Sequence, residues 1–270
     1  MFARGVVSTP SALAVRNSTP VARFNWKRLL FPMRHLFLML PLLAAGCTDA
    51  PDAPAPTAPA PAATAPPAPR AEAASDSVVV LFFGDSLTAG YGLADPGREA
   101  YPALVGEQLA AAGIPARVVN AGVSGETSAG GLRRVDWVLS RTTPDVFVLA
   151  LGANDGLRGQ PVDAMEANLT AILDKVKAVA PNARLVVAGV AALPNLGADY
   201  GTAFRAVFPR VAERAGATLI PFLLEGVAGE RSLNQPDQVH PTAAGARILA
   251  QTVGRVVVPV VREAAAAKAS

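Results

Sequence analysis

The strongest constraint in this chain is a regular alternation of apolar, β-branched runs with segments of helical spacing. Five runs have the composition of buried strands: 78–83, 117–120, 145–151, 184–191 and 218–222. Helical spacing follows them at 101–112, 127–140, 162–179, 203–215 and 242–261. Continuous apolar strands between helices are typical of a parallel sheet covered on both faces. The sequence therefore predicts a three-layer α/β/α sandwich with a five-stranded parallel sheet over residues 77–262, followed by a C-terminal tail, 263–270.

The N-terminal part, residues 1–47, has the layout of an export signal. After Met33, the basic Arg34 precedes an apolar run over 36–45 and small residues that end at Cys47. Ten apolar residues suit a secretory signal peptide, whereas a membrane-spanning helix needs about 20. Residues 1–32 are either an unusually long leader or follow a start codon placed too early, with Met33 as the true start.

The only cysteine stands at the end of this signal. Residues 43–47 resemble a bacterial lipoprotein box, in which the cysteine thiol is acylated, although Ala44 stands where the box most often has Leu. The resemblance implies lipidation of Cys47, export, and anchoring to the cell envelope on its periplasmic side. Thr48, rather than an Asp, favours the outer membrane. The alternative is an ordinary cleaved signal in which Cys47 has no role.

Residues 48–76 form a different region with no candidate core. The stretch 49–70 holds eight prolines and nine alanines in 22 positions, without aromatic or β-branched aliphatic residues. This composition favours extended polyproline II, which reaches roughly 3.1 Å per residue. We therefore expect a disordered Pro/Ala-rich linker that holds the folded domain away from the membrane.

Charge and composition exclude several classes of function. The net charge is +3, but residues 1–47 carry six Lys/Arg and no Asp or Glu, leaving 18 basic against 21 acidic residues in the rest. Without its leader the protein is slightly acidic, which removes the basis for nucleic-acid binding. One cysteine excludes an internal disulfide and a cysteine-based zinc site, and two histidines exclude a histidine-rich one. We expect no metal and no cofactor, and no Gly-x-Gly-x-x-Gly or Walker-type sequence is present.

Small and polar residues follow the predicted strands in four blocks. They are Gly-Asp-Ser-Leu-Thr-Ala-Gly-Tyr-Gly at 84–92, Asn-Ala-Gly-Val-Ser-Gly-Glu-Thr-Ser at 120–128, Gly-Ala-Asn-Asp at 152–155, and Asp-Gln-Val-His-Pro at 237–241. In α/β sheets, ligands bind outside the carboxyl ends of the strands. We therefore expect all four blocks to meet at one edge of the sheet.

These blocks, in this order, resemble those of the SGNH, or GDSL, hydrolase family, and the resemblance covers 78–257. It is greatest to the bacterial multifunctional thioesterase I, lysophospholipase L1 and arylesterase branch, as at 84–91, 124–128, 203–209 and 221–222. The resemblance implies the flavodoxin-like SGNH fold and a serine esterase that forms an acyl-enzyme on Ser86.

The residue types suit that chemistry. Serine-dependent ester hydrolysis needs an activated hydroxyl, a base, an orienting carboxylate and donors for the oxyanion. Ser86 follows the first strand, and His240 is the only histidine outside the export segment. Asp237 lies three positions before His240, so one loop can supply both partners. Asp85 is the competing carboxylate, but its side chain points away from that of its neighbour Ser86, and we assign it a structural role.

The resemblance also implies an oxyanion hole made by the backbone N–H groups of Ser86 and Gly125 and the side-chain amide of Asn154. Glycine permits close approach of the backbone, and an amide donates without adding charge. Simple helix capping by Ser86 or Asn154 is the structural alternative. We expect a structural role for Asp155.

The loop at 193–200 resembles the mobile substrate-gating loop of that branch. Its Leu193 and Leu196, together with Leu157, are candidates to line an acyl groove, although leucines at loop bases often serve the core. Carboxylic esters are the expected substrates: aryl esters, short to medium acyl esters and lysophospholipids, with thioesters as a side activity. The alternatives are a carbohydrate O-deacetylase of the same fold and a non-catalytic surface lipoprotein.

Overall fold

The computed structural model describes residues 77–192 and 194–270. The predicted signal peptide, Cys47, the predicted linker and Leu193 lie outside the described residues. Those predictions are therefore taken up again only as proposals.

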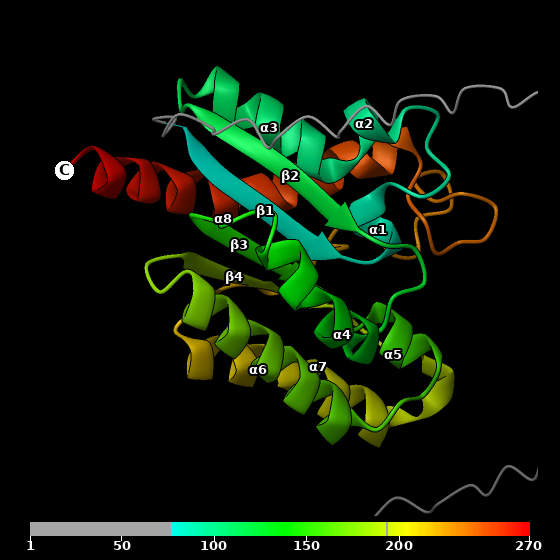
Figure 1. Ribbon diagram of the computed structural model, residues 1–270. Coiled ribbons are helices and arrows are strands. Elements are labelled where there is room, and N and C mark those ends of the chain that lie inside the picture. Colours follow the sequence, from blue (N-terminus) through cyan, green and yellow to red (C-terminus); the bar gives the residue numbers. More distant parts are fainter. Residues whose placement is uncertain (1–76, 193) are drawn as a thin grey trace, which may run out of the picture. The chain divides into compact units, whose positions relative to one another are not determined.

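A five-stranded parallel sheet forms the centre of the domain (Figure 1). Its strands are β1 (Val78–Gly84), β2 (Ala116–Gly122), β3 (Val146–Ala150), β4 (Arg184–Ala188) and β5 (Thr218–Ile220). They lie in the order β2-β1-β3-β4-β5, and every neighbouring pair is parallel. This order, found in flavodoxin-like folds, reverses between β1 and β3, and the carboxyl ends of these two strands mark the expected ligand crevice.

Helices cover both faces of the sheet. The long ones are α3 (Tyr101–Ala111), α4 (Ser128–Leu139), α6 (Val162–Val179), α7 (Ala198–Ala215) and α8 (Ala243–Ala269). The short ones are α1 (Ser86–Ala89), α2 (Pro96–Glu99), α5 (Ala153–Leu157) and the 3-10 helix η1 (Pro194–Leu196). In Figure 1, α3 and α8 lie on one side of the sheet and α4, α6 and α7 on the other. The predicted three-layer α/β/α architecture is confirmed.

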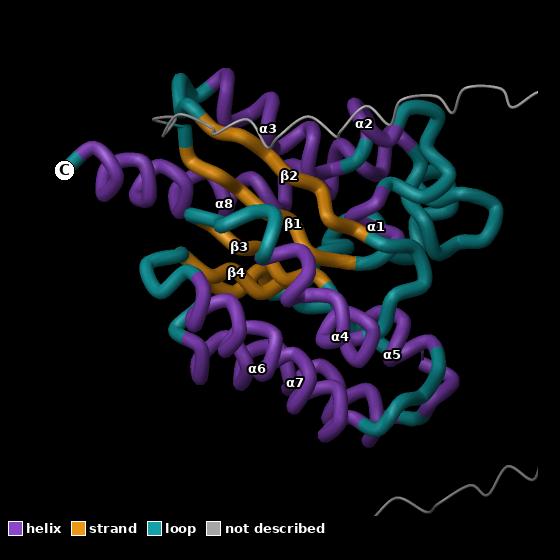
Figure 2. The backbone as a smooth tube through the Cα atoms, viewed as in Figure 1, coloured by secondary structure: helices purple, strands orange, loops and turns teal. Residues whose placement is uncertain are grey.

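The core lies between the sheet and these two helical layers. All seven residues of β1 and all five of β3 are buried, as expected for the central strands of a sheet covered on both sides. β2 lies at an edge and is only partly buried. The continuous apolar runs therefore identified the central strands, and the loops beyond their carboxyl ends, drawn in teal in Figure 2, are free to carry chemistry.

Two helices differ from their predicted bounds. α7 begins at Ala198 rather than at residue 203, so the expected loop at 193–200 contains η1 and the first turn of α7. α8 continues to Ala269, so most of the expected tail at 263–270 is helical. Lys268, near the end of that helix, donates to the carbonyl of Ser77 and to Asp145. These contacts join the end of α8 to the beginning of β1.

The length and apolar composition of α8 alone would allow it to cross a membrane, but 56% of its most apolar window is buried. Its buried face includes Leu249, Val253 and Val257, which belong to the core cluster. Packing against the sheet accounts for the apolar character of this helix.

Candidate active site

The four polar blocks meet at the carboxyl edge of the sheet, as predicted. β1 ends at Gly84, and Ser86 is the first residue of α1. Gly122 ends β2 beside that helix, since a Cβ at this position would lie 2.3 Å from the backbone nitrogen of Ala89. The side-chain amide of Asn120 donates to the carbonyl of Thr88 (2.7 Å), which further ties β2 to α1.

An unbroken chain of hydrogen bonds joins Asp237, His240 and Ser86. His240 Nδ1 lies 2.7 Å from Asp237 Oδ2, and His240 Nε2 lies 2.9 Å from Ser86 Oγ. The residues at the two ends are 151 positions apart in the sequence, so the fold brings this geometry together. In this arrangement the serine hydroxyl is hydrogen-bonded to an imidazole, and a carboxylate orients that imidazole. It is the arrangement that activates a serine nucleophile.

The Asp237 carboxylate is held in its ionised form by local donors. Oδ1 accepts the backbone N–H of Val239 (2.9 Å) and that of His240 (3.0 Å), while Oδ2 faces the imidazole. These donors, chiefly the backbone and side chain of His240, lower the pKa of Asp237 to about 2. The turn that permits this wrapping places Gln238 at φ +58°, a left-handed conformation that is uncommon outside glycine.

The neighbouring carboxyl of Asp85 has a different environment. It is buried, caps α1 by accepting the N–H of Leu87 (3.0 Å), and lies 3.5 Å from Asn154 Nδ2. Burial raises its pKa from 3.8 to about 7. Asp85 makes no hydrogen bond to His240, and its capping contact agrees with the structural role expected from the sequence.

Three potential hydrogen-bond donors belong to the segments at this edge of the sheet: the backbone N–H groups of Ser86 and Gly125 and the side-chain amide of Asn154. Gly125 has φ +77°, and only the Arg158 guanidinium, at 3.7 Å, would approach a Cβ placed there. Among the described residues, the backbone N–H groups of Ser86 and Gly125 have no hydrogen-bond acceptor. Asn154 lies in the first turn of α5, and its side-chain amide has a second N–H beyond the one directed at Asp85. These groups are free to receive negative charge on a substrate oxygen.

Comparison with known proteins agrees with this geometry. The GDSL-like Lipase/Acylhydrolase family model matches residues 82–248. Esterase TesA of Pseudomonas aeruginosa is 38% identical over 182 residues, covering 67% of this chain and 88% of that esterase.

This chain belongs to the GDSL-like lipase/acylhydrolase family. Thioesterase 1/protease 1/lysophospholipase L1 of Escherichia coli is 34% identical over 189 residues, covering 70% of this chain and 86% of that protein. The crystal structure of the esterase EstA from Pseudoalteromonas sp., inhibited by monoethylphosphonate, has a TM-score of 0.64 at 33% identity and covers 69% of this chain and 100% of EstA. The chain is thus a carboxylic ester hydrolase of the serine type.

Several residues that fix the geometry of this acylhydrolase were missed in the sequence. The side chain of Arg134 donates to Glu126 and to the carbonyl of Ala121 (3.0 Å), which holds the loop that carries Gly125. Arg158 donates to the carbonyl of Gly125 itself (3.0 Å). Arg134 lies within α4 and Arg158 directly follows α5, so both are outside the four blocks. Only their positive charge close to these polar segments could have indicated their role.

A second connection joins α5 to α4. Asp155 accepts hydrogen bonds from the backbone N–H (2.8 Å) and the hydroxyl (2.6 Å) of Ser128, the first residue of α4. Asn168 of α6 donates to the same hydroxyl (3.0 Å). Asp155 therefore fixes the helix that presents Asn154 relative to the loop that presents Gly125, in agreement with its expected structural role.

The leucines predicted to bind substrate differ in their exposure to solvent. Leu157 ends α5, three residues after Asn154, and is 42% exposed. Leu196 lies in η1 and is partly buried, and its Cδ2 would lie 3.5 Å from a Cβ at Gly159. Leu193 is outside the described residues. Of the two described leucines, Leu157 is the exposed one, whereas Leu196 packs toward the segment that follows α5.

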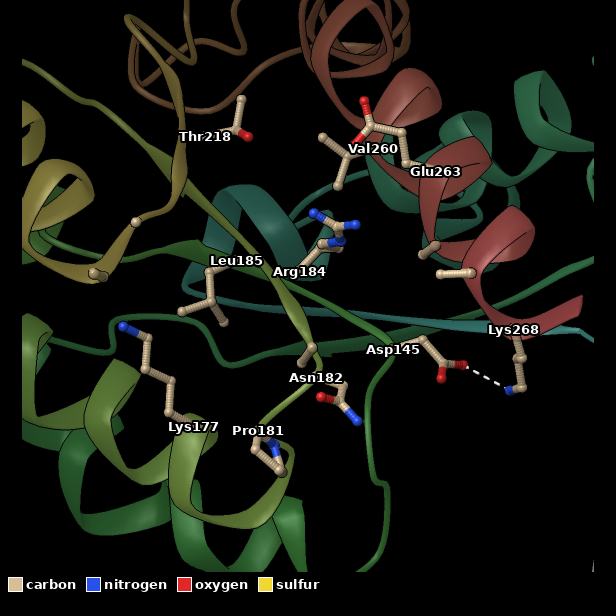
Figure 3. Close-up of a pocket in the computed structure, with 15 residues that line it drawn as sticks. Asp145, Lys177, Pro181, Asn182, Arg184, Leu185, Thr218, Val260, Glu263 and Lys268 are labelled. Atoms are coloured by element: carbon tan, nitrogen blue, oxygen red, sulfur yellow. Dashed lines mark hydrogen bonds and ion pairs between the residues drawn. The ribbon is translucent and has the colours of Figure 1, made fainter. Parts of the chain in front are cut away.

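A large cleft lies at the other edge of the sheet. It has a volume of about 660 Å³ and is lined by residues at the amino ends of strands, including Arg184 of β4 and Thr218 of β5. An ion pair between Lys268 and Asp145 (2.9 Å) crosses its wall (Figure 3). The cleft includes none of the four polar blocks. Within residues 77–192 and 194–270, no group of three or more His, Cys, Asp or Glu side chains could hold a metal ion.

Proposed function

We propose that this protein hydrolyses carboxylic esters by forming an acyl-enzyme on Ser86, with His240 as general base and acid and Asp237 as the residue that orients it. The observation that carries the proposal is the pair of hydrogen bonds of 2.7 and 2.9 Å that run from Asp237 through His240 to Ser86. A neutral imidazole whose Nδ1–H is held by a carboxylate has its Nε2 lone pair free to accept the serine proton.

The reaction then proceeds in two steps, acylation of Ser86 and hydrolysis of the acyl-enzyme. As Ser86 Oγ bonds to the ester carbon, its proton moves to His240 Nε2, and the carbonyl oxygen becomes an oxyanion. When the bond to the leaving oxygen breaks, the same proton passes to that oxygen and the alcohol departs. In the second step, a water oxygen bonds to the acyl carbon while His240 Nε2 takes a proton from that water. When the bond between the acyl carbon and Ser86 Oγ breaks, His240 returns the proton to Ser86 Oγ and the carboxylic acid departs.

The oxyanion is proposed to lie among the N–H groups of Ser86 and Gly125 and the Asn154 amide. Within residues 77–192 and 194–270, these donors have no competing acceptor apart from the Asp85 contact of Asn154. Donors fixed before the reaction stabilise the transition state without reorganising as charge develops.

Replacing Ser86 with alanine tests the proposal directly. We expect kcat for p-nitrophenyl esters to fall by about 10⁶-fold, because the attacking oxygen is removed. Circular dichroism should stay unchanged, since His240 is the only hydrogen-bond partner of the Ser86 hydroxyl among the described residues. Ser124→Ala, in an exposed loop residue, is a matched control that should retain activity. Full turnover by Ser86→Ala would refute the assignment.

We propose that the substrates are aryl esters, short to medium acyl esters and lysophospholipids, with thioesters as a side activity. The exposed Leu157 beside Asn154 supports an aliphatic acyl group near the site. The carbohydrate O-deacetylase alternative predicts the reverse preference. Comparing kcat/KM for p-nitrophenyl octanoate with that for acetate release from acetylated glycans distinguishes the esterase from the O-deacetylase. Faster release from the glycans would support the O-deacetylase and contradict the proposed substrates.

We also propose that the enzyme is exported and anchored to the envelope by a lipid on Cys47, for which the signal-like sequence at 33–47 is the support. A Cys47→Ser variant should lose membrane association in cell fractionation while keeping esterase activity. Thr48→Ser is the matched control for the same segment. Unchanged membrane association of Cys47→Ser would refute the anchor, and the esterase proposal would stand.

A further inference from the structure

Tyr91 is a large side chain beside the nucleophile that has no part in the proposed chemistry. It follows α1 and is 53% exposed. Its ring lies against the His240 imidazole, with centroids 4.7 Å apart and planes inclined by 47°. The small void of about 10 Å³ that Tyr91 and Ser86 line with the buried Tyr101 and Leu249 is too small for a substrate, so the open side of Tyr91 is its exposed part. An aromatic ring at this place is available to a bound substrate.

The backbone of Tyr91 is fixed by a residue of the loop that carries His240. Gln235 Nε2 donates both to the carbonyl of Tyr91 (2.8 Å) and to that of Pro241 (2.9 Å). The Gln235 N–H donates to the carbonyl of His240 (2.7 Å). The next residue, Gly92, has φ +74°, which favours glycine, and a Cβ there would displace the side-chain amide of Gln235. One amide side chain thus sets the position of Tyr91 relative to His240.

The ring itself is not needed to complete these contacts. In the described part of the chain, the Tyr91 hydroxyl has no hydrogen-bond partner, and the Gln235 bond reaches the main chain only. The aromatic side chain is therefore held in place by its backbone while one side of it stays open to solvent.

The chemistry places a particular part of the substrate next to this ring. In the proposed mechanism the proton on His240 Nε2 passes to the leaving oxygen, so the alcohol part of the ester must lie beside the imidazole when the C–O bond breaks. Tyr91 is the aromatic residue in contact with that imidazole. A flat aromatic group attached to the leaving oxygen would meet its ring face or edge, arrangements that aromatic pairs favour.

Resting on the proposed function, we propose that Tyr91 binds the alcohol part of the ester and makes the enzyme selective for esters of aromatic alcohols. Tyr91 is then a specificity-determining residue for the leaving group. Tyr91 acts during the acylation step, in which the ester C–O bond breaks and the leaving phenol oxygen takes the proton from His240. It does not act in deacylation, since the alcohol has then departed and every acetate ester leaves the same acetyl group on Ser86.

The test compares phenyl acetate with ethyl acetate, measured by pH-stat titration of the released acid. For Tyr91→Ala, kcat/KM for phenyl acetate should fall roughly threefold to tenfold, the range expected for loss of one aromatic pair. The same variant should change kcat/KM for ethyl acetate by less than about twofold. Where deacylation limits turnover, kcat for phenyl acetate should stay unchanged, because the acetyl-enzyme is common to both esters.

Three variants serve as controls. Tyr91→Phe keeps the ring and should behave as the wild type. Tyr91→Leu keeps apolar volume without the ring and should lose selectivity as Tyr91→Ala does. Trp137→Ala removes another exposed aromatic residue, on α4 and stacked with Arg141, and should have no effect.

Two results would overturn the proposal. An equal loss of kcat/KM on both esters would mean that Tyr91 only supports His240, and no loss on either would mean that the ring does not contact the substrate. In both cases the inactivity of Ser86→Ala would leave the proposed function intact, whereas an active Ser86→Ala enzyme would refute that function independently of Tyr91.

Discussion

The amino and carboxyl edges of the sheet differ both in the size of their cavities and in the side chains that they carry. The amino edge has a cleft of about 660 Å³ and an ion pair between Lys268 and Asp145. At the carboxyl edge, the pocket beside Ser86 measures about 10 Å³, yet this edge carries the hydrogen-bond chain to His240 and Asp237. Cavity size alone would have placed the site at the wrong edge.

In this fold, the direction of the strands decides at which edge of the sheet the catalytic residues lie. All five strands are parallel, so their carboxyl ends and the loops that follow converge on one edge. The amino edge receives the ends of helices instead, and Lys268 and Asp145 form an ion pair there. The predictions below test whether activity belongs to one edge alone.

The largest effect expected after Ser86→Ala is that of Asp237→Asn. An asparagine at this position still accepts backbone N–H groups but lacks the charge that holds the Nδ1–H tautomer of His240. By analogy with the chymotrypsin triad, where the equivalent change is known, kcat should fall by about 10⁴-fold. Steady-state assays with p-nitrophenyl butyrate measure this.

The low pKa of Asp237, about 2, adds a pH prediction. Its folded-state pKa lies below the ordinary value of 3.8, so the ionised form prevails above pH 4, and protonation sets in only as the pH falls through 4 toward 2. The pH profile of kcat/KM above pH 5 should therefore contain no limb from this carboxylate. If Asp237→Asn retained more than a tenth of wild-type activity, Asp237 would not orient His240.

Asn154→Ala should have the next largest effect. Removing one oxyanion donor typically lowers kcat by about 10²- to 10³-fold, because the developing charge loses a fixed hydrogen bond. KM should change little, since the ground-state carbonyl carries little charge. Asn182→Ala, at an exposed asparagine of the amino edge, is a matched control that should keep wild-type kcat. A rise in KM at constant kcat would contradict the oxyanion role.

A smaller effect concerns stability at the carboxyl edge. Burial holds the pKa of Asp85 at about 7, above its ordinary 3.8, so the folded state binds this proton more tightly than the unfolded chain does. This contribution is fully present below pH 4 and is lost as the pH rises to 7. Asp85→Asn keeps an acceptor for the Leu87 N–H and does not titrate.

Urea unfolding at pH 4 to 7 measures that contribution. The free energy of unfolding of the wild type, relative to Asp85→Asn, should decrease by about 1 kcal/mol or more over this range. A difference that stays constant or increases with pH would show that Asp85 is ionised in the folded protein.

The smallest effect is expected at the amino edge. Lys268→Met breaks the partly exposed ion pair with Asp145 and should lower the free energy of unfolding by about 1 kcal/mol at most. Its kcat/KM should match that of the wild type within about twofold. A large loss of activity would mean that the two edges are coupled, and the comparison between them would fail.

The fold and the outline of the site could be predicted from the sequence for physical reasons. Runs such as 78–83 are buried on both faces, which leaves an apolar signal in the chain. The blocks around Ser86, Asn154 and His240 directly follow strands or end a strand-to-helix loop, so parallel strand direction alone brings them together. These predictions need no knowledge of side-chain packing.

The missed features depend on contacts between distant segments. Gln235 reaches Tyr91 across 144 positions, and Arg158 reaches Gly125 across 33. Neither contact leaves a periodic signal. The early start of α7 at Ala198 was missed because Gly197 and the residues before it have the composition of a loop. The continuation of α8 to Ala269 follows from packing of Val260, Val261 and Ala264 into the core.

The central claim is that Ser86 is a nucleophile activated by His240. It is tested most directly by reaction with a fluorophosphonate, followed by mass spectrometry of the labelled peptides. The account predicts one label per chain, on Ser86, none in Ser86→Ala, and much slower labelling of His240→Gln. A label on another residue, or equal labelling of His240→Gln and the wild type, would contradict it.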